Sequence, residues 1–203
     1  MMRLEQAGRT HVGHVREKNE DSMLLSPDLG LFVVCDGMGG HVGGQVASQL
    51  AVRTIDQVVR TGQPAPAPED RDPLVTAIRC ANYAIFTQAR NDPSLHNMGT
   101  TVVGVRQQGD LLHICHVGDS RIYRLAYHSG ELIQVTRDHS LLQEQIDAGL
   151  ITAQQAAQAS PAGHPEDKAQ RQEARVGPFG CGLEPLGMGV DHDLHHQDCG
   201  GDQ

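Results

Sequence analysis

The chain has 203 residues, enough for one domain with a substantial core, and its composition is acidic. The 25 Asp and Glu residues against 16 Lys and Arg give a net charge of −9, which argues against a nucleic-acid partner. Its 5 cysteines lie far apart without a Cys-x-x-Cys pair, so we expect a reducing cytoplasm and neither a zinc site nor a disulfide scaffold. No apolar run approaches the ~20 residues that a membrane span needs, so no membrane partner is expected.

Short strands are predicted within residues 4–36. The apolar residues 23–25 and 31–35 flank a Ser-Pro-Asp-Leu-Gly turn, which predicts a hairpin. Apolar residues at helical spacing then predict a helix from residue 43 to about residue 60. After a proline-rich loop, a second amphipathic helix is expected from residue 74 until an Asp-Pro pair ends it.

The chain then returns to strand spacing. Residues 100–105 and 111–117 are predicted to form one hairpin around Gln-Gly-Asp, and residues 121–125 and 132–135 another around Ser-Gly. Between residues 140 and 155, Ser-x-x-Gln and Thr-x-x-Gln sequences have the spacing of capping boxes and predict two short helices.

Strands paired by tight turns, with two consecutive helices between them, predict an α+β fold of antiparallel sheets covered by helices. The chain lacks the strand–helix–strand alternation of a doubly wound sheet, so a nucleotide-binding α/β protein is the least favoured alternative. We expect one domain over residues 1–203, with an atypical loop-like segment at residues 161–186, which is rich in Gly, Pro, Gln and charge. Residues 191–199 are dense in potential metal ligands, but their irregular alternation favours a polar strand and turn over a transition-metal site.

Carboxylates stand at the ends of the predicted strands. Glu20 and Asp21 precede one strand and Asp36 ends the next, so a hairpin can bring them together. Asp119 follows a third strand. Hard oxygen ligands of this kind suit Mg²⁺ or Mn²⁺, and two such ions can activate a water and neutralise a phosphoryl group. The alternative is that Asp36 and Asp119 belong to ordinary turns.

Two other side chains are candidates for the chemistry. Arg16, on a predicted strand, carries a planar guanidinium that can bind a phosphate through two bonds, although a solvated surface arginine is the common alternative. His41 lies in a glycine-rich turn after Asp36, where it could protonate a leaving oxygen or be incidental. The glycines around it lack the Lys-Ser/Thr of a P-loop and are weak support for nucleotide binding.

Five segments together resemble the ordered motifs of bacterial type 2C metal-dependent serine/threonine protein phosphatases. They are Arg-Glu-Lys-Asn-Glu-Asp at 16–21, Asp-Gly-Met-Gly-Gly-His at 36–41, Met-Gly-Thr-Thr at 98–101, His-Val-Gly-Asp-Ser-Arg-Ile-Tyr at 116–123 and Thr-Arg-Asp-His-Ser at 136–140. The resemblance covers residues 8 to about 160, in order and with matching spacing.

The resemblance implies a four-layer α-β-β-α sandwich of antiparallel sheets, incomplete at the C-terminus, with a binuclear Mn²⁺ or Mg²⁺ centre at one edge. It implies that Asp36 bridges the two ions and that the Gly37 carbonyl and the Glu20 side chain complete one side. Asp119 matches a position that binds a third ion in bacterial members. Arg16 would hold the substrate phosphate, and His41 is a less certain counterpart of the general acid.

The implied function is hydrolysis of phosphoserine and phosphothreonine in proteins that are targets of a serine/threonine kinase, by a cytoplasmic monomer. Two further metal-binding aspartates of the family, in a Ser-Asp-Gly turn and an Asp-Asn pair, do not occur in the sequence. Residues 161–182 also lack the family's Thr-Arg-x-Leu-Gly element. We therefore expect a truncated phosphatase of doubtful activity. The alternative is a catalytically silent fragment or pseudophosphatase that binds a partner or a phosphoprotein.

Overall fold

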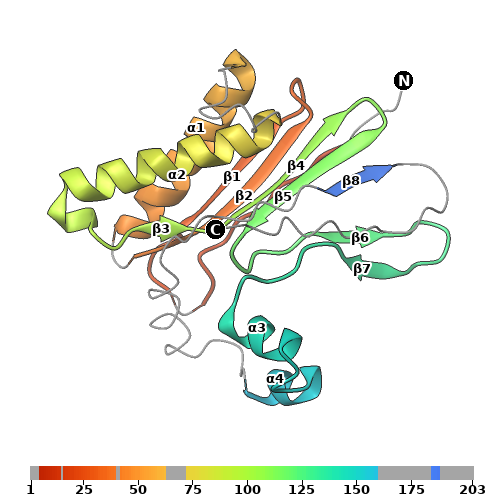
Figure 1. Cartoon of the computed structure of the whole chain (residues 1–203). Helices are drawn as coiled ribbons and strands as arrows, with labels where there is room; N and C mark the ends of the chain where they lie inside the picture. Colours follow the sequence, from red (N-terminus) through yellow and green to blue (C-terminus); the bar gives the residue numbers. More distant parts are fainter. Residues whose placement is uncertain (1–4, 15, 40–41, 63–71, 160–183, 188–203) are drawn as a thin grey trace, which may run out of the picture. The chain divides into compact units, whose positions relative to one another are not determined.

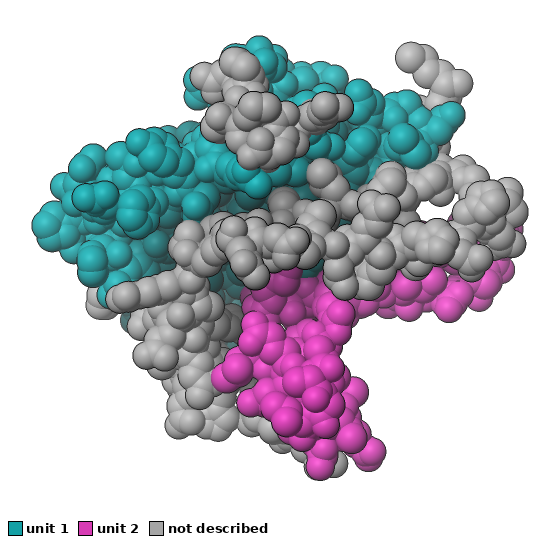
Figure 2. Space-filling view, viewed as in Figure 1, with its two compact units in different colours: residues 1–116, 180–203 teal, residues 117–179 magenta. Residues whose placement is uncertain are grey.

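The computed structural model describes residues 5–14, 16–39, 42–62, 72–159 and 184–187. The chain divides into two compact units, one formed by residues 1–116 with 180–203 and the other by residues 117–179 (Figure 2). Each unit is described by itself. No described helix has both the length and the apolar character needed to cross a membrane.

The first unit is built on a sheet with the strand order β1-β2-β4-β5-β8, in which β3 also pairs with β2 (Figure 1). Its strands are β1 (Asp21–Ser26), β2 (Leu31–Met38), β3 (Gly99–Thr100), β4 (Val102–Gln108), β5 (Leu111–Val117) and β8 (Glu184–Gly187). The β1–β2, β2–β3, β2–β4 and β5–β8 pairings are antiparallel. The hairpins predicted around residues 26–30 and 108–110 are confirmed, because β1 pairs with β2 and β4 is hydrogen-bonded to β5.

Strand β8 differs from the sequence-based expectation at its first three residues. Residues 184–186 fall in the segment that composition predicts to be loop, yet they pair with β5 at the edge of the sheet. Pairing with an otherwise open strand edge outweighs local composition, and an edge strand is where a proline such as Pro185 is tolerated. The preceding residues, 161–183, lie outside the described residues.

Helices α1 (Gly43–Thr61) and α2 (Pro73–Asn91) confirm the two predicted amphipathic helices and cover one face of the sheet (Figure 1). Their buried side chains and every second residue of β2 form the core, with Leu31, Cys35 and Ile55 fully buried. Full burial of a leucine or isoleucine side chain contributes roughly 1.5–3 kcal/mol to the stability of the fold. A short 3₁₀ helix, η1 (Pro93–Leu95), follows α2.

The second unit contains a hairpin and two helices. Strands β6 (Tyr123–Leu125) and β7 (Leu132–Gln134) pair antiparallel, and α3 (Leu141–Asp147) and α4 (Ala153–Ala159) follow. Both helices begin at the predicted capping residues: the Ser140 hydroxyl accepts a hydrogen bond from the Gln143 amide at 3.2 Å. The Thr152 hydroxyl does the same for the Gln155 amide, also at 3.2 Å.

Candidate metal centre

Asp36 lies between the part of β2 that pairs with β4 and the part that pairs with β3. Its N–H donates to the Thr101 hydroxyl at 3.0 Å, and its carbonyl accepts from the Thr101 amide at 2.9 Å. The Thr100 hydroxyl also donates to the Asp36 carbonyl, at 3.0 Å. The N–H and the carbonyl of Asp36 are therefore both bonded to this pair of threonines. The Asp36 side chain is on the sheet face opposite the helices, because the residues of β2 alternate between the two faces.

Asp21 stands directly opposite Asp36 in the β1–β2 ladder. Directly opposed residues of an antiparallel pair carry their side chains on the same face, so the predicted convergence of carboxylates at this end of the hairpin is confirmed for these two. Asp21 is fixed by its amide, which donates to Asn19 Oδ1 at 3.0 Å. Both aspartates are half-buried.

Glu20 is held against the first turn of α1. Its carbonyl accepts from the Gly37 amide at 3.3 Å and from the fully buried Ser48 hydroxyl at 2.6 Å. A Cβ on Gly44 would lie 2.7 Å from Glu20 Oε2, and a Cβ on Gly37 would lie 2.7 Å from the Glu20 carbonyl oxygen. Only glycine allows the end of β2, the start of α1 and Glu20 to approach so closely. The carboxylate is thereby placed near the positive end of the helix dipole.

The donors at this end of the sheet are of the kind that a hard divalent cation prefers. Asp36 and Glu20 supply carboxylates and Gly37 supplies a carbonyl, and both Mg²⁺ and Mn²⁺ accept such oxygens. Within the described ranges, no three His, Cys, Asp or Glu side chains are gathered closely enough to hold an ion by themselves. The site thus fits such an ion in its donor chemistry, with water needed for the remaining ligands. The ligand-dense residues 191–199 lie outside the described part of the chain.

Of the two candidate residues for phosphate chemistry, Arg16 is placed differently from the expectation and His41 is not described. Arg16 is exposed and belongs to no strand, so the prediction of a strand at this position is wrong. The segment around it is a run of charged and amide side chains without apolar alternation, and residues 16–20 have no partner strand among the described residues. His41 falls outside the described residues, so its role stays a prediction.

Asp119 belongs to the second unit and follows a turn at Gly118, which His139 holds by two hydrogen bonds. The His139 amide donates to the Gly118 carbonyl at 3.0 Å, and the Gly118 amide donates to His139 Nδ1 at 3.3 Å. Gly118 has φ +99°, a conformation that favours glycine. Asp119 is half-buried directly after this turn.

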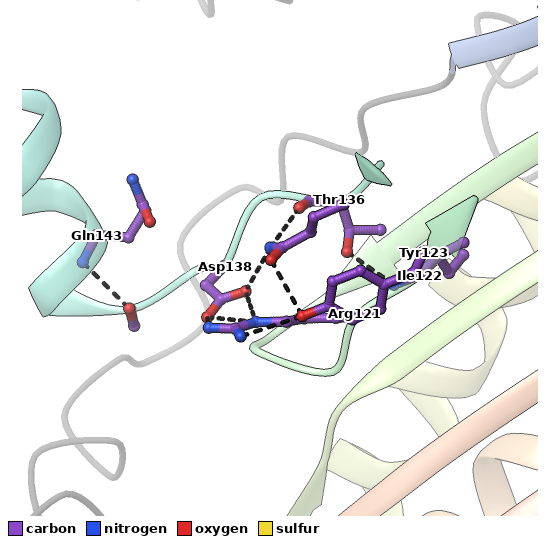
Figure 3. Close-up of polar contacts among 8 residues, drawn as sticks. Arg121, Ile122, Tyr123, Thr136, Asp138 and Gln143 are labelled. Carbon is purple, nitrogen blue, oxygen red and sulfur yellow. Dashed lines mark hydrogen bonds and ion pairs between the residues drawn. The ribbon is translucent and has the colours of Figure 1, made fainter. Parts of the chain in front are cut away.

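An ion pair between Arg121 and Asp138 lies close to this turn in the sequence of the second unit (Figure 3). Arg121 Nε and Nη2 donate to the Asp138 carboxylate at 2.8 and 2.6 Å, a two-bond contact, and the Asp138 side chain is only 12% exposed. Hydrogen bonding to Asp138 and then to Tyr123 raises the pKa of Arg121, so its charge is permanent. Tyr123 donates onward to Gln134 at 3.2 Å, which ties the hairpin into the network.

The comparison with known proteins is decisive for the family. The Protein phosphatase 2C family matches residues 7–162. This chain belongs to the protein phosphatase 2C family. It is 38% identical over 153 residues to the serine/threonine protein phosphatase PstP of Mycobacterium tuberculosis, covering 75% of this chain and 28% of PstP. It is 37% identical over 152 residues to the serine/threonine phosphatase stp of Listeria monocytogenes, covering 73% of this chain and 60% of that one.

Solved structures of protein phosphatase 2C proteins agree with the fold. The crystal structure of Mycobacterium tuberculosis PstP/Ppp matches 88% of this chain and 71% of that one, with a TM-score of 0.70 and 33% identity. The PstP catalytic domain in complex with 2 manganese ions matches 73% of this chain and 61% of that one, with a TM-score of 0.62 and 38% identity. The predicted α+β class of antiparallel sheets flanked by helices is confirmed. This chain spans about three-fifths of the length of the Listeria relative.

Several residues that organise the site carried no role in the sequence-based interpretation. Thr100 and Thr101 lie in one of the five protein phosphatase 2C motifs, and Arg121 and Asp138 in two others, but their contacts depend on which strands meet. Ser48 had no signal beyond a small polar residue within an amphipathic helix. For Thr100, Thr101, Arg121 and Asp138, the sequence offered one hint, namely their presence in segments that resemble the family motifs.

Proposed function

We propose that this protein hydrolyses phosphoserine and phosphothreonine in phosphoproteins with the help of Mn²⁺ or Mg²⁺. The observation that carries the proposal is the arrangement of Asp36 and Gly37 near the end of β2. They are fixed by Thr100 and Thr101 and packed against Glu20, in a chain of the protein phosphatase 2C family. Its relatives are named serine/threonine phosphatases, and the PstP catalytic domain has a structure with 2 manganese ions.

In this proposal Asp36, Glu20 and the Gly37 carbonyl would hold two ions, and Asp119 would hold a third. The ions, when bound, supply a water that is nucleophilic at neutral pH and offset charge on the phosphoryl group. Arg16 binds the phosphate oxygens through its guanidinium and orients the phosphoryl group. His41 donates a proton to the leaving serine or threonine oxygen. No side chain has to form a covalent intermediate.

The proposal extends to the setting of the reaction. The substrates are phosphoproteins made by a serine/threonine kinase, and the enzyme acts as a monomer in the cytoplasm. The net charge of −9 supports a protein rather than a nucleic-acid substrate, because a phosphate backbone would be repelled.

A second candidate is a catalytically silent module that binds phosphoproteins or another partner. Two observations favour it. Within the described ranges, no three potential side-chain ligands converge on one point. The sequence also contains neither a Ser-Asp-Gly turn nor an Asp-Asn pair, which the resemblance requires for metal binding.

Hydrolysis of p-nitrophenyl phosphate and of a phosphothreonine peptide, with and without Mn²⁺, separates the two candidates. The enzyme hypothesis expects Mn²⁺-dependent turnover that Asp36→Asn abolishes, because amide oxygen is a poor replacement for a shared carboxylate. Phosphopeptide binding without turnover, unchanged in Asp36→Asn, would support the silent module.

A further inference from the structure

We infer that Thr101, assisted by Thr100, is a positioning residue that sets the orientation of the Asp36 carboxylate and the Gly37 carbonyl. The inference rests on the proposed function, since it assigns these threonines to the same cation site. Neither threonine needs to touch an ion or a substrate. Their effect is on the backbone from which two of the donor groups project.

The register of β2 places Asp36 and Thr101 opposite each other. Leu31–Val34 pair with β4, and Gly37–Met38 pair with β3, in one continuous register that places Thr101 opposite Asp36. In a regular antiparallel ladder, two opposed residues that hydrogen-bond exchange both N–H···O=C bonds. One of these bonds is made here from the Thr101 amide to the Asp36 carbonyl at 2.9 Å.

Side-chain hydroxyls also bond to the backbone of this residue pair. The Asp36 N–H donates to the Thr101 hydroxyl at 3.0 Å. The Thr100 hydroxyl lies within hydrogen-bond distance of both carbonyls of the pair, 2.9 Å from that of Thr101 and 3.0 Å from that of Asp36. Two neighbouring hydroxyls thus constrain the backbone of the residue that is proposed to ligate the ions.

The bond between the Thr101 hydroxyl and the Asp36 amide has a geometric consequence for the site. Thr101 is 3% exposed, so water cannot readily take over its hydroxyl's role. Without the hydroxyl, the Asp36 amide loses this bond and its peptide is less constrained. A shift of that peptide changes the directions of the Asp36 side chain and of the adjoining Gly37 peptide. A residue that fixes metal ligands in this way typically changes affinity when it is replaced.

Three variants test the inference. Thr101→Val removes the hydroxyl at nearly constant volume, and Thr101→Ser restores it. Thr76→Val is the matched control, because Thr76 is a 2% exposed threonine in α2 whose hydroxyl donates to the Asp72 carbonyl at 3.3 Å. Mn²⁺ affinity is measured by calorimetry on the whole chain. Amide hydrogen exchange at Asp36 and Gly37 is measured by NMR without metal, and the midpoint of thermal unfolding is recorded for each variant.

We expect Thr101→Val to weaken Mn²⁺ binding by ~10–100-fold and to speed exchange at the Asp36 amide. Thr101→Ser should remain close to wild type in both measurements, and Thr76→Val should lower only the unfolding midpoint. If Thr101→Val does not fold, Thr100→Val, which removes one of the two donors to the Asp36 carbonyl, should show the same pattern in weaker form.

The inference is overturned if Asp36 exchange and Mn²⁺ affinity change no more in Thr101→Val than in Thr76→Val, since that pattern indicates a purely structural threonine. If the wild-type chain binds no Mn²⁺, the proposed cation site fails. The metal-free exchange rates then decide the positioning role by themselves.

Discussion

Asp21 and Asp36 face each other directly across β1 and β2, so two carboxylates share one face at the same end of the hairpin. Like charges in directly opposed positions destabilise an antiparallel pair. In the metal-free chain this juxtaposition opposes folding, and a bound cation would relieve it. The same two carboxylates are therefore expected to destabilise the metal-free hairpin and to favour the proposed binding of a cation.

Asp21→Asn is therefore expected to raise the free energy of unfolding of the metal-free chain by about 0.5 kcal/mol. The same change should weaken Mn²⁺ binding, because a nearby negative charge is lost. Urea unfolding and calorimetry measure the two effects. Asp110→Asn, at the exposed turn between β4 and β5, removes one charge at the other end of β4 and should change neither. A loss of stability in metal-free Asp21→Asn would contradict the expectation.

Arg16→Ala should act on the substrate and not on the ion, because a guanidinium attracts phosphate and repels cations. We expect a higher KM for a phosphopeptide and an almost unchanged Mn²⁺ affinity. Steady-state kinetics and calorimetry provide the two values. A large loss of Mn²⁺ affinity would mean that Arg16 supports the cation site instead.

Gly44→Ala tests how closely Glu20 approaches α1. Alanine normally favours a helix over glycine by about 1 kcal/mol, but the added Cβ would lie 2.7 Å from Glu20 Oε2 and 2.8 Å from the Gly37 carbonyl carbon. We expect a net loss of about 1–3 kcal/mol in the free energy of unfolding. Gly43→Ala is the control, since its Cβ would meet the Met98 side chain at 3.2 Å, which needs only a small shift. Equal effects of the two substitutions would argue against a tight Glu20 contact.

Arg121→Met should destabilise the second unit by about 1–3 kcal/mol, because it leaves the nearly buried Asp138 carboxylate without its two-bond partner. Arg137→Met breaks the exposed ion pair with Asp147 and should have a much smaller effect. Hydrogen exchange at the His139 and Gly118 amides reports on this unit directly. Comparable losses for the two arginines would show that burial of Asp138 is unimportant.

Cysteine labelling reports on the core. Burial raises the pKa of the Cys35 thiol to about 12, with a smaller opposing contribution from a hydrogen bond to Thr100. Because the folded-state pKa is raised, this group favours the folded chain below its ordinary pKa of 9.0, and that contribution is lost as the pH rises toward 12. Alkylation near pH 9.0 should therefore modify the half-exposed Cys80 well before Cys35, which peptide mass mapping can follow. Equal rates would mean that the sheet opens there.

The elements that sequence predicted well are those whose signals are local. The turn before Leu31, the apolar face of α1 and the capping residues Ser140 and Thr152 depend on neighbours within a few positions, and the structure confirms them. Arg16 was misplaced because a charged run cannot reveal whether a partner strand exists beside it.

The candidate site also divides into features with local signals and features that depend on distant parts of the chain. The carboxylates at the ends of strands could be found because strand ends can be read from apolar runs, and the hairpin fixes Asp21 opposite Asp36. The groups that hold them could not, because the Thr101 contact spans 65 positions and the Ser48 contact 28. Such contacts arise only when β2, β3 and α1 are packed together.

The contacts of Thr100 and Thr101 with Asp36 also mark a boundary along β2. Leu31, Val33 and Cys35, before Asp36, are held by core packing, whereas the Gly37–Met38 ladder with β3 beyond it consists of two residue pairs. A ladder that short contributes little cooperativity. We therefore expect amide exchange at Met38 to follow a local opening of lower free energy than the unfolding of the core.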